Sequence, residues 1–317
     1  MEYIFLIAGF ILLIKGADLF VDGASAVAKK LRVPSVIIGL TIVAFGTSAP
    51  EAAVSITAAI EGNNGIAVGN IVGSNLFNLL VVVGISAILG SVPVEKDMLY
   101  RDYPFSIIAA IVLFVMSFDT KLGNSNEMVL SRGDGFILLV FFVIFMYTTI
   151  GSALKSRKST EPQVEQKEEK SVLTCIFLTV IGIAGIIIGG DLTVNSASEI
   201  AKTFGMSDTL IGLTIVAVGT SLPELVTSIV ATKKGENDLA LGNVVGSNLF
   251  NIFFILGSSA AIHSITLSIN VIYDMVMLIA INLIVFIFVF KSKKVNRPLG
   301  FFMVAAYTAY MIYAIIR

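Results

Sequence analysis

Long apolar segments, separated by short polar breaks, run along the whole chain. A helix needs about 20 apolar residues to cross the hydrocarbon core of a bilayer. The pattern predicts an all-α polytopic membrane protein with ten transmembrane helices, at about 3–28, 34–60, 65–90, 103–118, 134–152, 172–200, 207–232, 239–263, 270–290 and 299–316. Lys15 and Asp18 interrupt the first segment and no small-residue cleavage site closes it, so we expect a retained span rather than a signal peptide.

The amino-acid composition agrees with a membrane protein and argues against other classes. Of 317 residues, 56% are hydrophobic and 14% are charged, whereas an average soluble domain carries roughly 25% charged residues. A soluble enzyme is therefore excluded, and without clustered basic charge we expect no nucleic-acid partner. One Cys excludes a disulfide scaffold and a cysteine-ligated metal site. We expect no cofactor and no obligatory protein partner, with the lipid bilayer as the surroundings.

Basic residues divide unevenly between the two sets of loops. Lys and Arg accumulate in cytoplasmic loops, so their bias predicts orientation. Only four of the 21 Lys and Arg residues lie on the side of the loops that follow even-numbered spans. Sixteen lie in the loops that follow odd-numbered spans, namely Lys29, Lys30, Arg32, Lys96, Arg101, Lys155, Arg157, Lys158, Lys167, Lys170, Lys233, Lys234, Lys291, Lys293, Lys294 and Arg297. We therefore expect a multi-pass protein of the cell membrane with both termini outside and the charged linker 153–171 in the cytoplasm.

Two blocks of sequence occur twice. GLTIVAFGTSAPE at 39–51 returns as GLTIVAVGTSLPE at 212–224, and GNIVGSNLFN at 69–78 returns as GNVVGSNLFN at 242–251. Both pairs are offset by 173 positions, and 20 of the 23 residues are identical. The halves 1–152 and 172–317 are therefore read as duplicated five-helix units. Because five is odd, the second copy enters the membrane from the opposite side, an arrangement found in secondary transporters. Four or six helices per half would instead make the repeat parallel.

The first block places polar and helix-breaking residues inside an apolar span. Pro50 lacks an N–H, so the helix should break near Gly46. Broken helices in lipid are tolerated where the freed backbone groups line a cavity. A carboxylate at mid-membrane costs at least ~2.5–3.5 kcal/mol, so Glu51 should be functional. The block also supplies Thr47 and Ser48, and the second copy repeats the set as Thr220, Ser221, Pro223 and Glu224.

The second block forms one polar stripe on a helix. Asn70, Ser74 and Asn78 recur every fourth residue, and the second copy has Asn243, Ser247 and Asn251. Asn70 and Asn243 could bond helix backbones or face the ions. Asn75 and Asn248 fall off the stripe, and we expect them to be structural. Asp18 and Asp191 could form interhelical hydrogen bonds or lie on an ion route.

The two blocks together offer carboxylates, hydroxyls, amide oxygens and freed carbonyls. Hard cations such as Ca²⁺, Mg²⁺ and Na⁺ prefer these oxygen ligands. Two Glu supply up to two negative charges, which one divalent ion or two to three monovalent ions would balance. Because the ions would share ligands, occupancy would be exclusive, as antiport requires. The residues therefore indicate a cation exchanger.

The doubled GTSxPE and GNxxGSNxFN blocks resemble the α1 and α2 repeats (here 39–84 and 212–257) of the calcium/cation antiporter superfamily, sodium/calcium exchanger group, with the prokaryotic antiporters as the nearest branch. The resemblance implies Ca²⁺ export driven by Na⁺ entry through alternating access, with spans 2, 3, 7 and 8 as the ion core and spans 1 and 6 sliding against it. It implies an ion site made by Glu51, Glu224, Thr47, Ser48, Thr220, Ser221, Ser74, Ser247, Asn78, Asn251 and the carbonyls of Ala44 and Ala217.

Two departures from the family pattern bear on the transported ions. Some relatives carry Asp at the position of Asn251, so one possible charge is missing and potassium dependence is disfavoured. The proton/calcium exchangers of the superfamily place an acidic residue where this chain has Gly73 and Gly246.

Other functions remain as alternatives. Ca²⁺/H⁺ exchange is the next reading, because the two Glu could carry protons. A cation channel could use the same broken helices, although channels are usually assembled around symmetric subunits. An intramembrane hydrolase is disfavoured, because Ser48 has no basic partner in sequence and activated serines need one. We therefore expect a protein that is not an enzyme.

Overall fold

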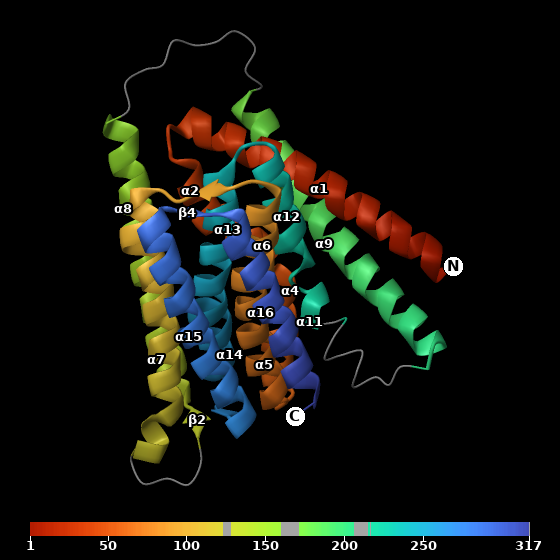
Figure 1. The fold of residues 1–317 in the computed structure, drawn as a ribbon, viewed down its shortest axis with the longest axis vertical. Coiled ribbons are helices and arrows are strands. Elements are labelled where there is room, and N and C mark those ends of the chain that lie inside the picture. The colour runs from red at the N-terminus through yellow and green to blue at the C-terminus, as the bar shows by residue number, and fades with distance from the viewer. Residues whose placement is uncertain (123–127, 160–170, 206–214, 216, 317) are drawn as a thin grey trace.

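The computed structural model describes the chain except residues 123–127, 160–170, 206–214, 216 and 317 (Figure 1). The elements of the first half are α1 (Glu2–Leu31), α2 (Ser35–Ile38), η1 (Gly39–Val43), α3 (Ala44–Thr47), α4 (Ala49–Ile60), α5 (Asn64–Phe77), η2 (Asn78–Val82), α6 (Val83–Leu89), β1 (Val92–Pro93), η3 (Met98–Asp102), α7 (Tyr103–Leu122), β2 (Val129–Leu130) and α8 (Arg132–Ser159). The η elements are π-helical turns.

The second half follows the same order. Its elements are α9 (Val172–Thr203), α11 (Ala217–Gly219), α12 (Leu222–Lys233), α13 (Asn237–Phe250), η5 (Asn251–Leu256), α14 (Gly257–Ile262), β3 (Ile265–Thr266), α15 (Ile269–Ser292), β4 (Lys294–Val295) and α16 (Arg297–Ile316). Over the described residues the helices overlap the expected spans, but α8 continues to Ser159 and so includes seven residues assigned to the linker. Lys155 and Arg157 are good helix formers and do not stop it.

In the part of the chain that the structure describes, seven helices are long and apolar enough to cross a membrane, and the bent pair Ser35–Thr47 and Ala49–Ile60 makes an eighth if it is one span. Two further expected spans contain α12 and α16, which do not meet this criterion over the described residues. The start of the span expected at 207–232 lies mostly outside the described residues. The molecule is therefore a helical membrane protein, and the count of ten stays a prediction.

The centre of the bundle is formed by the helices that carry the second repeated block. In the most apolar window of Asn64–Leu89, 83% of residues are buried, and the share for Asn237–Ile262 is 94%. Buried apolar side chains from both segments, among them Ile71, Leu76, Leu249 and Phe253, belong to one core. Membrane helices with little lipid contact can afford polar residues, because neighbouring helices satisfy them.

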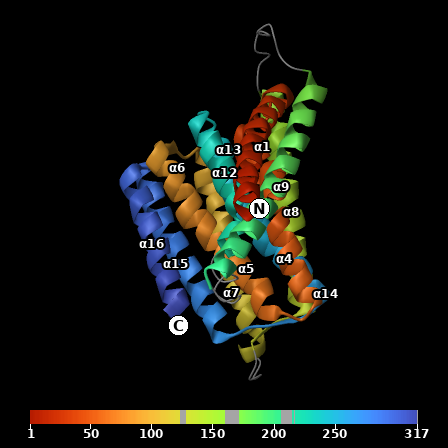
Figure 2. The same ribbon diagram turned by 90° about the vertical axis from the view of Figure 1, so that its right-hand side faces the viewer.

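Helices α1 and α9 form a separate pair along one edge of the bundle, tilted against the rest (Figures 1 and 2). Glycines allow their backbones to approach closely. A Cβ atom added to Gly16 would lie 2.7 Å from the backbone nitrogen of Ile186, and one added to Gly182 would lie 2.5 Å from that of Phe20. This tight packing makes the two helices one unit.

Two short antiparallel ribbons connect the halves. Val92 pairs with Val295, and Leu130 pairs with Ile265. Strands β1 and β3 are themselves related by the 173-residue offset. Each ribbon therefore joins the loop after the third expected helix of one half to the loop between the last two of the other. The sequence analysis did not predict these strands, because two-residue strands have no periodicity to detect.

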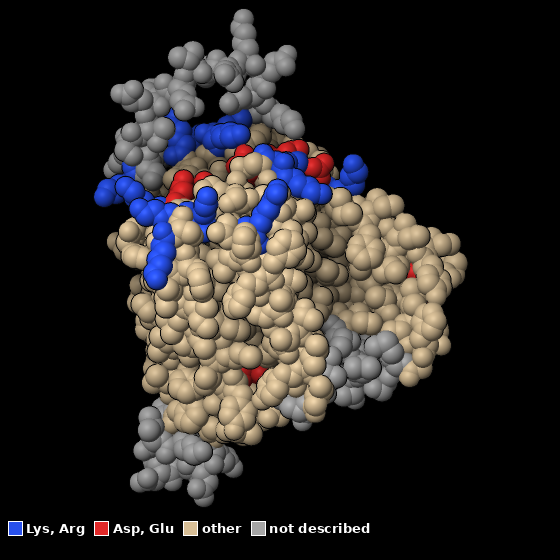
Figure 3. All heavy atoms as spheres, viewed as in Figure 1, with Lys and Arg blue, Asp and Glu red and all other residues tan. Residues whose placement is uncertain are grey.

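Basic residues gather at one end of the molecule. On the face that Figure 3 shows, Lys and Arg are concentrated at the end where α8 finishes, above a broad surface with only isolated acidic patches. A surface with so little charge is of the kind that lipid would cover.

Candidate functional site

The two repeated GTSxPE blocks form equivalent helix breaks. Helices α3 and α4 are bent by 52° at the break, where Ser48 has φ −84° and ψ 9°. Ser221, which precedes α12, has φ −91° and ψ 5°. A Pro follows within the first two positions of α4 and α12, where its missing N–H is no loss. The proline that ends one helical segment therefore begins the next.

This arrangement places each carboxylate in the first turn of a new helix. Glu51 lies in the first turn of α4 and Glu224 in the first turn of α12, and both are fully buried. The positive end of the helix dipole stabilises a negative charge there. The helix break thus offsets part of the cost of burying each carboxylate.

Serines from opposite halves hold the two carboxylates in a crossed arrangement. Ser48 Oγ donates to Glu224 Oε1 at 2.9 Å, and Ser221 Oγ donates to Glu51 Oε1 at the same distance. Each Glu also accepts from the stripe of its own half. Ser247 Oγ lies 3.3 Å from Glu224 Oε1, and Ser74 Oγ lies 3.5 Å from Glu51 Oε1. Neither half can therefore assemble its carboxylate site alone.

Asn70 and Asn243 link each carboxylate helix to the opposite half. Asn243 accepts from Thr47 Oγ1 at 3.0 Å, and Asn70 accepts from Thr220 Oγ1 at 3.4 Å. Their amide groups donate to Ser228 Oγ at 3.0 Å and to Ser55 Oγ at 2.9 Å, respectively. Both the oxygen and the NH₂ group of each side-chain amide therefore form hydrogen bonds within the protein. This favours the helix-bonding role over ion contact.

Four buried side-chain oxygens of the predicted site have no hydrogen-bond partner in the described part of the chain. They are Glu51 Oε2, Glu224 Oε2, Asn78 Oδ1 and Asn251 Oδ1. They form two pairs related by the 173-residue offset, and all four residues are fully buried. A buried acceptor without a partner costs about 1–3 kcal/mol, and more when it is charged. Oxygens of this kind, carboxylate and amide, are what a hard cation requires.

The remaining predicted residues occupy other positions. The carbonyl of Ala44, which begins α3, accepts from Ser48 N at 3.0 Å, and Ala217 begins α11. Asp191 is exposed on α9. The Asp18 side chain is 45% exposed and forms an ion pair with Lys234. The structure therefore places Asp18 away from the buried carboxylates.

The Lys234 ion pair joins α1 to the end of α12. Lys234 Nζ lies 2.6 Å from Asp18 Oδ1 and 2.7 Å from Asp22 Oδ1. Partial burial lowers the pKa of Lys234, but its hydrogen bonds to both carboxylates outweigh this effect and raise the pKa above its ordinary value. At the aligned position of the first half stands Glu61, and Asp191 aligns with Asp18. Because both aligned residues are acidic, Glu61 and Asp191 cannot form the equivalent ion pair.

Sequence reasoning missed two sets of contacts. Lys234 was counted only for orientation, because its partners are more than 200 residues away. Asn75 and Asn248 were expected to be structural, and their contacts with Asn251 and Asn78 were not predicted. The signal available in the sequence was that Asn occupies this position in both copies of the block.

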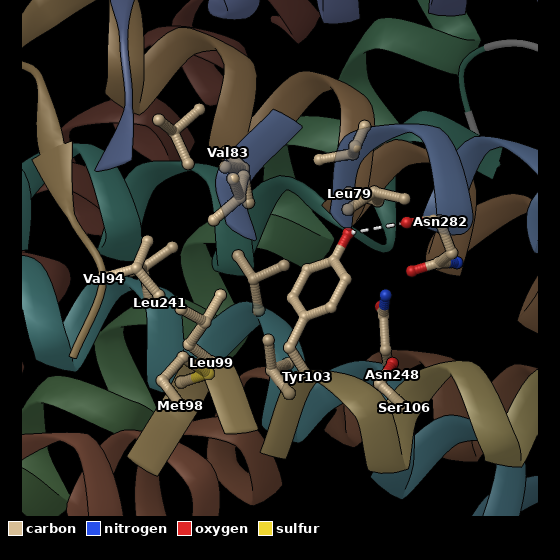
Figure 4. Close-up of a pocket in the computed structure, with 15 residues that line it drawn as sticks. Leu79, Val83, Val94, Met98, Leu99, Tyr103, Ser106, Leu241, Asn248 and Asn282 are labelled. Atoms are coloured by element: carbon tan, nitrogen blue, oxygen red, sulfur yellow. Dashed lines mark hydrogen bonds between the residues drawn. The ribbon is translucent and has the colours of Figure 1, made fainter. Parts of the chain in front are cut away.

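A pocket beside Asn248 is distinct from the carboxylate site. Figure 4 shows it lined mostly by apolar side chains, with the Tyr103 hydroxyl donating to the backbone oxygen of Asn282 at 3.3 Å. Among the described residues, no group of three or more His, Cys, Asp or Glu could hold a metal ion. A cation at the central site would therefore rely on two carboxylates and neutral oxygens.

Comparison with known proteins decides the family. The family model described as sodium/calcium exchanger protein matches residues 1–151 and 174–316. The chain belongs to this family. It is 35% identical to the sodium/calcium exchanger MaX1 of Methanosarcina acetivorans, covering 98% of this chain and 97% of that protein. It is 44% identical to the putative antiporter CaxA of Alkalimonas amylolytica, covering 80% and 78%.

A solved structure of a family member has the same fold. The sodium-calcium exchanger NCX_Mj, soaked with 2.5 mM Na⁺ and 0.1 mM Ca²⁺, is similar to this chain with a TM-score of 0.85 and 31% sequence identity. The match covers 98% of this chain and 97% of that one.

Replacement of either buried carboxylate should remove cation binding. Glu51→Gln and Glu224→Gln each delete one charge from a site with no basic residue in either repeated block. Losing about 3 kcal/mol or more would weaken Ca²⁺ binding at least about a hundredfold, measured by equilibrium dialysis with ⁴⁵Ca²⁺.

Glu61→Gln is the matched control, because Glu61 is exposed at the other end of α4. Unaltered Ca²⁺ binding in either buried-site variant would contradict the assigned site.

Proposed function

We propose that the chain is a secondary active antiporter that exchanges Ca²⁺ for Na⁺ across the cell membrane. The observation that carries this proposal is the set of four unpartnered oxygens of Glu51, Glu224, Asn78 and Asn251. Two carboxylates provide up to two negative charges, which one Ca²⁺ or two Na⁺ would balance. Because both ions would use the same oxygens, one must leave before the other binds.

The names of family members support the choice of ions. MaX1 and NCX_Mj are both described as sodium/calcium exchangers and cover nearly the whole chain. The ion core would also include the hydroxyls of Thr47, Ser48, Thr220, Ser221, Ser74 and Ser247 and the carbonyls of Ala44 and Ala217. Export of Ca²⁺ would be driven by entry of Na⁺ down its gradient.

We further propose ten spans arranged as two inverted five-helix repeats, 1–152 and 172–317, joined by the linker 153–171. The crossed bonds Ser48–Glu224 and Ser221–Glu51 support a two-fold relation between the halves. The concentration of basic residues at one end supports a cytoplasmic location for the linker and an extracellular one for both termini. Inverted repeats with broken helices at the site suit alternating access.

The helices that move in this proposal are α1 and α9. They pack tightly on each other through glycines and lie at the edge of the bundle. If this pair slides along the ion core, the Lys234 ion pair with Asp18 and Asp22 must break. The ion pair would therefore stabilise the arrangement of α1 against α12 that the structure has.

Ca²⁺/H⁺ exchange is the second candidate. The Ca²⁺/H⁺ antiporter ChaA of Bacillus subtilis is 29% identical over 68% of this chain. The same two carboxylates could carry protons in place of Na⁺.

Transport into proteoliposomes separates the two exchange reactions. Vesicles loaded with Na⁺ should accumulate ⁴⁵Ca²⁺, whereas vesicles loaded with K⁺ or Li⁺ should show little uptake. A pH gradient imposed without Na⁺ should not drive uptake. Uptake that follows the pH gradient and ignores Na⁺ would replace Na⁺ exchange with proton exchange, and rapid flux without any counter-ion gradient would indicate a channel.

Removal of the ion pair should loosen the cytoplasmic end. Exposed ion pairs are worth about 0–1 kcal/mol, so Lys234→Gln should raise the opening equilibrium by up to about fivefold. Hydrogen–deuterium exchange of the peptides around residues 18–24 and 230–238 would report this opening. Lys233→Gln, which changes the neighbouring exposed lysine, is the control.

Equal hydrogen–deuterium exchange in both variants would show that the ion pair does not hold this end closed.

In a Cys175→Ala background, Lys234→Cys should react with a membrane-impermeant maleimide only from the cytoplasmic side. Labelling from the outside would reverse the proposed orientation.

A further inference from the structure

Asn75 and Asn248 form a reciprocal contact at the centre of the bundle. They lie on α5 and α13 and are 1% and 3% exposed. Asn75 Nδ2 donates to the backbone oxygen of Asn248 at 3.2 Å, and Asn248 Nδ2 donates to the backbone oxygen of Asn75 at 3.3 Å. The two halves therefore meet here through a symmetric pair of side-chain amides.

The backbone oxygens determine how both amides are oriented. A carbonyl oxygen only accepts hydrogen bonds, so the arm of each amide that faces it must be the NH₂ group. The other arm, Oδ1, then faces a second asparagine. Asn75 Oδ1 accepts from Asn251 Nδ2 at 3.0 Å, and Asn248 Oδ1 accepts from Asn78 Nδ2 at 3.3 Å.

The same logic extends one residue further. Because the NH₂ group of Asn251 is held by Asn75, its oxygen must point the other way, and the same holds for Asn78 and Asn248. The two oxygens that result, Asn251 Oδ1 and Asn78 Oδ1, are two of the four unpartnered oxygens. The orientation of both amides thus follows from two backbone carbonyls.

We propose that Asn75 and Asn248 are positioning residues for cation exchange, which hold the amides of Asn251 and Asn78 with their oxygens toward the ion. The inference rests on the proposed function. An asparagine amide can rotate by half a turn at little steric cost, because its oxygen and nitrogen are similar in size. Rotation would present NH₂ to the cation, and a donor group cannot act as a ligand.

The contact crosses between the halves, since Asn75 orients the ligand of the second half and Asn248 that of the first. Asn78 and Asn251 also begin the π-helical turns η2 and η5, a local geometry that often occurs at functional sites. Each half therefore prepares a ligand for the other, as Ser48 and Ser221 do for the carboxylates.

Replacement of the positioning residue should weaken Ca²⁺ binding without touching a ligand. Asn75→Leu removes the acceptor while keeping a similar volume, and we expect the Ca²⁺ dissociation constant to rise about tenfold by calorimetry. Asn248→Leu should behave alike. Asn282→Leu is the control, because Asn282 is a buried asparagine that donates to its own helix at Leu278 O. It should change the constant by less than about twofold.

A second background separates positioning from packing. A carboxylate has oxygen on both arms, so Asn251→Asp faces the ion with oxygen in either orientation. In that background the effect of Asn75→Leu should fall to about twofold or less. In an Asn78→Asp background it should stay about tenfold, because Asn75 does not hold Asn78.

Equal effects of Asn75→Leu in all three backgrounds would show a packing defect and overturn the proposal, as would an unaltered constant in the single variant. Asn75→Ala carries the same prediction if the Leu variant does not fold. Wild-type protein that fails to bind Ca²⁺ or to transport it would instead remove the proposed function.

Discussion

The structure depends on keeping two carboxylates buried in the middle of a membrane protein. Glu51 and Glu224 are fully buried, and neither repeated block contains a basic residue. A buried charge without a counter-charge is strongly unfavourable, so the surrounding structure must compensate. The compensation comes from helix N-termini and serine hydroxyls, and each Glu keeps one oxygen that has no partner among the described residues. The cost that remains is what a bound cation would offset.

This constraint accounts for several features of the fold. The helix breaks at Ser48 and Ser221 create the N-termini on which the carboxylates lie. The donor for each carboxylate comes from the opposite half, so a site exists only when both halves are assembled. The central helices are nearly free of lipid contact, because polar residues there need protein partners. The described residues of α1 and α9 make none of the hydrogen bonds that hold the two carboxylates, and α1 is linked to the end of α12 by the ion pair of Asp18 and Asp22 with Lys234.

Local sequence was sufficient to predict the helix breaks and to single out the two glutamates that the structure buries. Pro50 and Glu51 act on their own helix, so their effect could be read without knowing the tertiary structure. The polar stripe of Asn70, Ser74 and Asn78 was also a local property. The duplication indicated that each of these local features occurs twice.

Contacts between distant residues could not be read in this way. The repeat predicts that Ser48 and Ser221 are equivalent, but not that each crosses to the other half's carboxylate. Asn75 lies off the stripe, and its effect on Asn251 depends on how closely α5 and α13 approach. The ion pair of Lys234 with Asp18 likewise depends on where α1 packs. These contacts depend on the tertiary structure, and the periodicity of a single sequence does not predict them.

The central claim is that Ca²⁺ and Na⁺ compete for one set of buried oxygens. Calorimetric titration of purified protein with Ca²⁺, repeated at increasing Na⁺ concentrations with K⁺ holding the ionic strength constant, tests it most directly. We expect the apparent dissociation constant for Ca²⁺ to rise more steeply than in proportion to Na⁺, because more than one Na⁺ replaces each Ca²⁺. A constant that does not depend on Na⁺ would show separate sites and contradict the account.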